Sequence, residues 1–290
     1  MNARNIRLGA ISFVVLLVGL PATSHSQLVR SASGPGTIDI LAARDQFRMD
    51  LGGGTTAGAN GSFGGVRREI NWDATPAAFS APNNLPANFF NSNSPRGAVF
   101  STAGTGFQVS GASTDAGAGQ PAMANFGNIN PSYTTTFATF SPERLFTSLG
   151  SNIYDVTFFL PGTNTPGLVT GFGAVFTDVD LPNTTSIQYF DPLGASLGTF
   201  FVPAAAGSQT FSFLGVSFPT AQVSRVRVTA GNTALGTGVN DSNGSPTDLV
   251  VADDFLYGEP QAIPEPATTV LLACALGILA FRVVGKRRKH

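Results

Sequence analysis

The sequence predicts an all-β protein whose body is an antiparallel, jelly-roll-like β-sandwich with an irregular N-terminal part. The 290 residues include two Lys and four Glu but 24 Phe, a composition that disfavours long helices. Short runs of β-branched and aromatic residues recur from Val99 onward, separated by Gly, Pro, Asn and Asp. No repeat of fixed period is visible, which argues against a propeller or a solenoid.

The elements follow from local patterns along the body. Residues 27–64 begin as a polar linker, within which Thr37 caps a helix over 38–51 that closes at Gly52-Gly53-Gly54. Alternation places Val226 and Val228 on one face of a strand, opposite Arg225 and Arg227. We expect strands over residues 99–101, 106–110, 133–140, 153–160, 170–179, 186–190, 199–202, 210–218, 223–229 and 249–257. A turn at Asp191–Gly194 joins two of them.

The N-terminus has the features of a secretory signal peptide. Arg4 and Arg7 precede an apolar run of 13 residues from Leu8 to Leu20, which Pro21 and small residues end. This run is short for a membrane span. We therefore expect residues 1–26 to be removed on export, with a retained anchor as the alternative.

The C-terminus combines a rigid motif, an apolar span and a basic end. Pro264-Glu265-Pro266 precedes the 18 residues 267–284, which reach about 27 Å as a helix. That length approaches the ~30 Å of a bilayer core. The basic residues that would stop the helix on the cytoplasmic side are Arg282, Lys286, Arg287, Arg288 and Lys289. A plain single-pass anchor is the simpler interpretation.

Residues 261–290 resemble the PEP-CTERM sorting signal of Gram-negative bacteria, because the Pro-Glu-Pro motif, the short span and the basic cluster occur in that order. The resemblance implies that an exosortase-type membrane enzyme cleaves near the motif and releases or transfers the protein outward. It also implies passage through the export machinery, transient anchoring in the inner membrane and a final place at the cell surface or outside the cell. These residues would mark a substrate of that enzyme.

The composition of the exported body, residues 27–260, excludes several chemistries. Both His (His25 and His290) and the only Cys (Cys274) lie outside it, so His- or Cys-dependent triads, zinc sites and disulfides are excluded there. Nine Arg against 16 acidic residues give the body a net charge of −7, which does not favour nucleic acid. Oxygen ligands remain, and they suit calcium.

We divide the body at the loop-rich stretch 141–151 into an irregular part, 27–150, and a sandwich module, 151–260; a single sandwich with an irregular N-terminal half is the alternative. Segments 171–180, 213–218 and 251–258 resemble a jelly-roll module of exported proteins that carry the same tail, similar to lectin-like sandwiches. The resemblance implies a fold and leaves the ligand open.

Two groups of oxygen ligands are candidate calcium sites. The first is a loop in which ligands are spaced around a Gly: Asp241, Asn243 and Asp248. The second combines Asp178 and Asp180, which alternation places on one face with Phe176, with Asp253. Alternation also predicts that only one of Asp253 and Asp254 points inward. The alternatives are an ordinary polar turn and structural hydrogen bonding.

Glu69, Trp72 and Asp73 combine an aromatic platform with carboxylates, as sugar sites do, although a core role for the Trp is the simpler interpretation. Three functions therefore remain. The leading one is a non-enzymatic protein of the surface or matrix that associates with exopolysaccharide, with calcium as a candidate cofactor. The others are a carboxylate-dependent glycoside hydrolase or lyase, and a matrix protein without a ligand.

Overall fold

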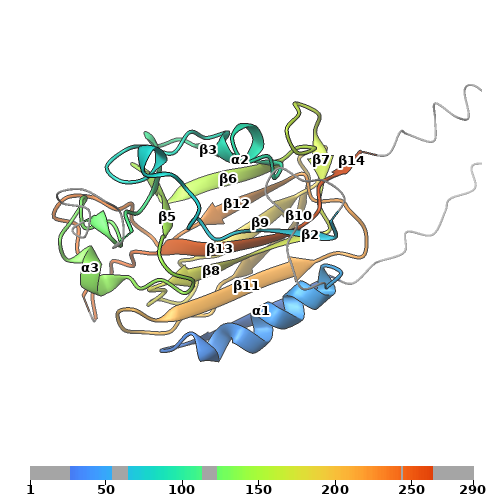
Figure 1. Ribbon diagram of the computed structural model, residues 1–290. Helices are drawn as coiled ribbons and strands as arrows, with labels where there is room; N and C mark the ends of the chain where they lie inside the picture. Colours follow the sequence, from blue (N-terminus) through green and yellow to red (C-terminus); the bar gives the residue numbers. More distant parts are fainter. Residues whose placement is uncertain (1–26, 54–64, 113–122, 243, 264–290) are drawn as a thin grey trace, which may run out of the picture.

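In the computed structural model, two antiparallel sheets face each other as a sandwich (Figure 1). The structure describes residues 27–53, 65–112, 123–242 and 244–263. Residues 1–26, Asn243 and residues 264–290, on which the predicted signal peptide, sorting motif, membrane span and basic cluster fall, lie outside these residues. Within them, no helix is both long and apolar enough to cross a bilayer.

The larger sheet has β13 near its middle. Its strands, in spatial order, are β1 (Leu28–Gly34), β11 (Phe211–Ser217), β8 (Gly171–Thr177), β13 (Val251–Gly258), β5 (Phe146–Leu149) and β4 (Gly106–Val109). A seventh strand, β2 (Arg67–Ile70), also pairs with β13.

The smaller sheet forms the second layer. Its order is β10 (Ser196–Phe201), β9 (Ser186–Phe190), β12 (Arg225–Thr229), β6 (Ile153–Phe158) and β3 (Ala98–Thr102). A short ribbon pairs β14 (Gln261–Ala262) with β7 (Gly167–Leu168). Strands from both sides of residue 150 contribute to each of the two large sheets.

Alternation decides which side chains fill the space between the sheets. Val226 and Val228 of β12 are buried while Arg227 is exposed, as the sequence predicts. Aromatic rings dominate the core. The indole of Trp72 stacks on Phe146 with ring centroids 4.3 Å apart, and its edge meets Phe255 at 5.0 Å. Residues 27–260 contain no Cys, so this packing stabilises the sandwich without disulfides.

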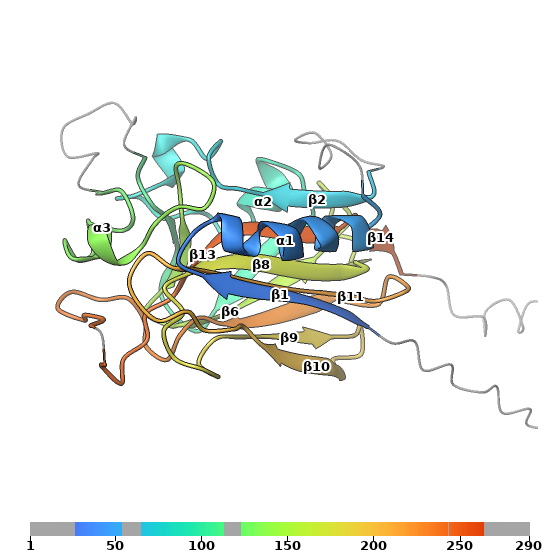
Figure 2. The same cartoon turned by 90° about the horizontal axis from the view of Figure 1, so that it is seen from below.

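The helix α1 (Ile38–Asp50) covers the outer face of the larger sheet, lying along β1, β8 and β11 (Figure 2). Phe47 of α1 is fully buried there. Beneath it lie Gly173 and Gly215, which are directly paired across β8 and β11. A Cβ at either glycine would come within 2.8 Å of the Phe47 ring. These two glycines therefore create the hollow that seats the helix.

The helix begins and ends where the sequence predicts, but its start is stabilised differently. Thr37 makes no capping hydrogen bond. The carboxylate of Asp39 instead accepts the Gly36 N–H at 2.8 Å. At the other end Gly53 N–H donates to the Arg48 carbonyl at 2.9 Å, and Gly52 and Gly53 both have positive φ.

Besides the strands β2, β5, β7 and β14, which the sequence analysis did not predict, two segments differ from the sequence expectation. The predicted strand over 133–140 is instead the short helix α3 (Tyr133–Thr136) followed by a loop, because hydroxyl groups there bond to nearby carbonyls. Thr135 Oγ1, for example, donates to the Ser132 carbonyl at 2.9 Å. The predicted linker contains β1, whose small polar residues form a strand through a seven-residue register with β11.

We predict that Phe47→Ala and Gly215→Ala each destabilise the protein, the first by about 3–5 kcal/mol and the second by about 1–3 kcal/mol. The double variant should lose less than the sum, because the added methyl then points into the space that the ring has vacated. Urea unfolding, followed by the fluorescence of the single Trp, measures all three. Phe201→Ala, at a 52% exposed ring, is the matched control. Strict additivity would contradict the proposed seating of the helix.

A candidate cation site at one end of the sandwich

Four aspartates meet where the chain crosses between the sheets. Asp178 and Asp180 follow β8 on the way to β9, and Asp241 and Asp248 lie on the connection from β12 to β13. The carboxylates of Asp178, Asp180 and Asp241 offer oxygens that lie within 4.8 Å of one another. The two candidate calcium groups of the sequence thus contribute to a single cluster, which we call the aspartate cluster.

The antiparallel register brings these residues together. Thr177, the last residue of β8, pairs with Val251, the first residue of β13. The residues that follow β8 therefore lie beside those that precede β13. At Asp178 the backbone turns to a φ of 71°, which ends the strand. The expected alternation of Asp178 and Asp180 with Phe176 thus stops at Thr177, and a turn places the two carboxylates.

Hydrogen bonds fix three of the four carboxylates. Asp248 is fully buried and accepts the Asp180 N–H at 2.9 Å and the hydroxyl of Thr184. Asp180 accepts the Gly207 N–H at 2.7 Å. Asp241 accepts the Leu249 N–H at 2.6 Å. Asp248 thus holds the loop together, and the other three carboxylates face one another.

The fourth carboxylate, that of Asp178, is the unusual one. The residue is 1% exposed, and neither carboxylate oxygen has a hydrogen-bond partner among the described residues. The Gln209 N–H, which acts to lower the pKa of Asp178, donates its hydrogen bond to the Thr136 carbonyl at 2.8 Å. Burial, followed by the charges of Asp180 and Asp241, raises the pKa of Asp178 to about 8.

The same causes act on the rest of the cluster. Burial raises the pKa of Asp241 to about 6, assisted by the charges of Asp180 and Asp248. Burial also raises the pKa of Asp248, against the hydrogen bond from Thr184. In the described part of the chain no Arg forms an ion pair with any of the four. A proton or a cation must therefore balance the charge.

The donors fit calcium better than a softer metal. All are carboxylates, and a hard cation with several oxygen ligands suits them. Zinc would require His or Cys in most structural sites, and the body contains neither. Asp178, Asp180 and Asp241 would be the direct ligands, with Asp248 supporting the loop that carries Asp180. Asn243 lies outside the described residues.

Asp253 belongs to a different cluster. Its carboxylate accepts the Phe140 N–H at 2.6 Å and the Ser141 hydroxyl at 3.1 Å, and that hydroxyl lies 2.6 Å from Asp254. The register of β13 against β8 shifts between Ala252 and Phe255, so Asp253 and Asp254 are both buried. Alternation, which would bury one of the two carboxylates and expose the other, therefore does not hold here. Burial raises the pKa of both residues.

The three candidate sugar-binding residues point to separate places. Glu69 is held by Arg48 at 2.7 Å and also pairs with Arg67. Trp72 is 1% exposed, with its indole N–H donating to the Asp253 carbonyl at 2.6 Å. Asp73 accepts the Glu143 N–H at 2.6 Å. These contacts are structural, and Trp72 also borders a cavity.

Sequence reasoning missed two supports of the aspartate cluster, Thr184 and Gly207. Thr184 follows Pro-Asn in a turn, and Gly207 lies in a small-residue loop. Neither pattern differs from that of an ordinary surface turn. Only the pairing of distant strands gives these residues a role.

No protein-family model matches this chain, and no curated protein matches it. Among solved structures it is similar to a glycoside hydrolase family 43 arabinoxylan arabinofuranohydrolase from Bacillus subtilis, with 15% identity, a TM-score of 0.26, and coverage of 58% of this chain and 28% of that one. It is also similar to the tailspike protein 4 enzymatically active domain of Bacteriophage CBA120, with 12% identity, a TM-score of 0.22, and coverage of 61% and 20%. The chain thus spans less than a third of either protein. At these scores neither similarity bears on function.

We predict that millimolar calcium raises the melting temperature of the protein relative to chelator. Binding to the folded state alone, at 100-fold excess over Kd, would stabilise it by about 2.7 kcal/mol. Asp178→Asn should remove the response, while Asp45→Asn, a change at an exposed aspartate on α1, should retain it. Equal melting temperatures of the unchanged protein in calcium and in chelator would contradict the cation site.

The stability of the calcium-free protein should also depend on pH through Asp178. Its folded pKa of about 8 lies above the ordinary value of 3.8, so the folded state binds a proton that the unfolded chain releases. The contribution of Asp178 is present in full below pH 4 or so and is lost as the pH rises to about 8.

Asp73, Asp241, Asp248, Asp253 and Asp254 also have raised pKa values, so the informative quantity is a difference between variants. In chelator, the melting temperatures of Asp178→Asn and of the unchanged protein should be most similar at low pH. At pH 8.5 the variant should have the higher melting temperature. Parallel melting curves across this range would contradict the assignment.

Proposed function

We propose that this chain is an exported, non-enzymatic protein whose lectin-like β-sandwich associates with polysaccharide at the cell surface or in the extracellular matrix and is stabilised there by calcium. The observation that carries the calcium part is the buried, unpartnered carboxylate of Asp178 facing Asp180 and Asp241. Calcium is abundant outside the cell, and a site that fills only after export would stabilise the fold at its destination.

A carboxylate-dependent glycoside hydrolase or lyase is the second candidate. Such an enzyme requires two carboxyl groups that flank an accessible cleft. Glu69 is engaged by two Arg, and the lining of the aromatic cavity beside Trp72 includes no Asp or Glu among the described residues. These contacts favour binding over catalysis. Release of reducing sugar from the host's matrix polysaccharide, lost in a Glu69→Gln variant, would favour the enzyme.

Polysaccharide association has a direct measurement. The protein should cosediment with matrix polysaccharide of its own host in calcium, and less of it should do so in chelator. Retention of the melting transition under both conditions is the control, because it separates loss of binding from loss of fold. Absence of cosedimentation in calcium would contradict the association and favour a matrix protein without a ligand.

The tail, we further propose, is a processing signal read by an exosortase-type enzyme. Its Pro residues cannot join a helix interior, so the segment before the apolar span would be extended and open to a membrane enzyme. The basic cluster would hold the span at a fixed depth.

Replacing Pro264-Glu265-Pro266 with three alanines should leave membrane insertion intact, because the span is unchanged, and should abolish release. Full-length protein should then accumulate in the inner-membrane fraction, as an immunoblot would measure. A matched triple alanine replacement of Leu193, Gly194 and Ser196, in the exposed β9–β10 hairpin, should be released normally. Equal release of the two variants would leave a plain membrane anchor as the better account.

A further inference from the structure

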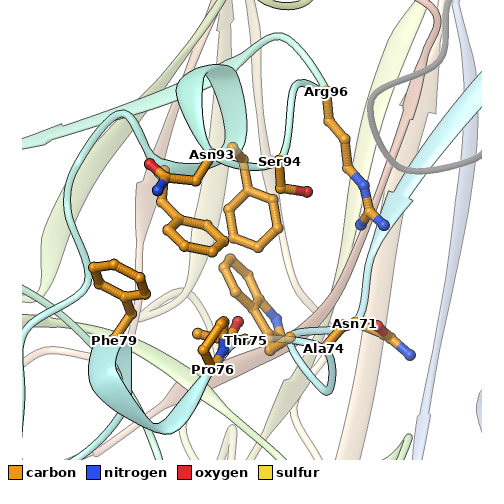
Figure 3. A pocket seen from close by; sticks show the side chains of 11 residues that line it. Asn71, Ala74, Thr75, Pro76, Phe79, Asn93, Ser94 and Arg96 are labelled. Atoms are coloured by element: carbon orange, nitrogen blue, oxygen red, sulfur yellow. The ribbon is translucent and has the colours of Figure 1, made fainter.

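A cavity of about 260 Å³ opens on the side of the sandwich opposite α1, between residues 71–79 and residues 89–96 (Figure 3). The first segment follows β2, and the second contains α2 (Phe89–Ser92). The cavity lies apart from the aspartate cluster, and none of the cluster's residues line it. Its wall has an aromatic part and a polar part.

The aromatic part is a continuous series of rings. The ring centroids of Phe79 and Phe89 are 5.2 Å apart, those of Phe89 and Phe90 are 5.0 Å apart, and those of Phe90 and Trp72 are 5.4 Å apart. Phe79 is half-buried at the mouth, whereas the other three are buried. An apolar wall of this kind stacks against the C–H face of a sugar ring, and it cannot bind the ring's hydroxyls.

The polar part is built around Arg96. One guanidinium nitrogen, Nη1, donates to the Glu69 carbonyl at 2.7 Å, and the group lies 5.8 Å from the centre of the Phe90 ring. Its Nε is buried without a hydrogen-bond partner, as is Oγ1 of Thr75, which also lines the cavity. Figure 3 shows Arg96 on the far side of the opening from Phe79. Buried donors without partners are rare in folded proteins.

The charge balance around Arg96 is unusual for a body with a net charge of −7. Asp73, which lies in sequence between the lining residues Trp72 and Ala74, accepts the Glu143 N–H at 2.6 Å, and Glu69 is shared by Arg48 and Arg67. Glu259 is paired with Arg68. Among the described residues, no carboxylate forms an ion pair with Arg96, whose pKa burial lowers. A guanidinium in this setting favours an anionic ligand, above all a planar carboxylate.

We propose that this cavity binds one uronic acid residue of an acidic polysaccharide. The pyranose ring would lie on the aromatic wall at Phe79 and Phe89, with its carboxylate toward Arg96 and a ring hydroxyl toward Thr75, which lies beside Pro76 (Figure 3). The cavity is smaller than the roughly 300–1,000 Å³ of sites for drug-sized ligands, which suits a single sugar ring. The inference rests on the proposed association with polysaccharide and names the class of polysaccharide.

Three small probes test the assignment on the unchanged protein. D-glucuronate and D-glucose differ in having a carboxylate or a hydroxymethyl group at carbon 6, and acetate carries the carboxylate without the ring. Titrations followed by protein NMR should give glucuronate a dissociation constant at least tenfold below those of glucose and acetate. Equal binding of glucose would overturn the role of the charge, and equal binding of acetate would overturn the role of the ring. Failure of all three to bind would overturn the site.

Two variants then locate the binding. Arg96→Gln should weaken glucuronate binding by roughly ten- to a hundred-fold, the loss expected for hydrogen bonds to a charged group, and should leave weak glucose binding unchanged. Thr75→Val, nearly isosteric, should weaken glucuronate binding severalfold. Arg227→Gln, at an exposed arginine of β12, should change nothing. Undiminished glucuronate binding by Thr75→Val would contradict the assignment, even if Arg96→Gln fails to fold.

The outcome is separable from that of the proposed function. If the protein cosediments with matrix polysaccharide in calcium and yet binds no glucuronate, the association stands and this cavity is not its site. If glucuronate binds and cosedimentation fails, the cavity recognises free acidic sugars and the matrix association is wrong.

Discussion

The carboxylate of Asp178 is almost fully buried, has no hydrogen-bond partner in the part of the chain that the structure describes, and faces two further carboxylates within 4.8 Å. A buried charge in that position is costly unless a proton or a cation balances it. The connections β8–β9 and β12–β13 meet at this cluster. The charge state of the Asp178 carboxylate therefore affects both connections. An unbalanced charge would therefore destabilise this end of the sandwich.

The remainder of the fold is stabilised by close packing of side chains, since residues 27–260 contain no Cys and hence no disulfide. Trp72 stacks on Phe146 between the sheets, and Phe47 fills the hollow above Gly173 and Gly215 on the outer face. Most of the described Arg side chains form ion pairs with acids outside the aspartate cluster, as Arg68 does with Glu259 and Arg227 with Asp155. Among the residues that the structure describes, this distribution leaves the aspartate cluster without an ion-paired Arg and leaves Arg96 without an ion-paired carboxylate. The two unbalanced places have opposite charge and lie in different parts of the molecule.

Local pattern was enough to predict most of the sheet. The alternation of Val226 and Val228 with Arg227, and the turn at Asp191, follow from residue chemistry and neighbours in sequence. The failures have a common cause, because each depended on a partner distant in sequence or on a competing local bond. β1 is a strand because it pairs with β11, and Tyr133–Thr136 is helical because hydroxyls bond to nearby carbonyls. The site was predicted as two separate groups of aspartates, and the register of Thr177 with Val251 joined parts of both. That register also assigned Asp253 to another cluster through a shift that alternation does not anticipate.

A crystal structure of the protein grown in millimolar calcium tests the central claim most directly. Anomalous scattering should locate a peak about 2.3–2.6 Å from carboxylate oxygens of Asp178, Asp180 and Asp241. The same crystals soaked in chelator should lose the peak. A well-ordered aspartate cluster that shows no peak in calcium, with Asp178 hydrogen-bonded to a neighbouring carboxylate as a protonated acid, would contradict the account.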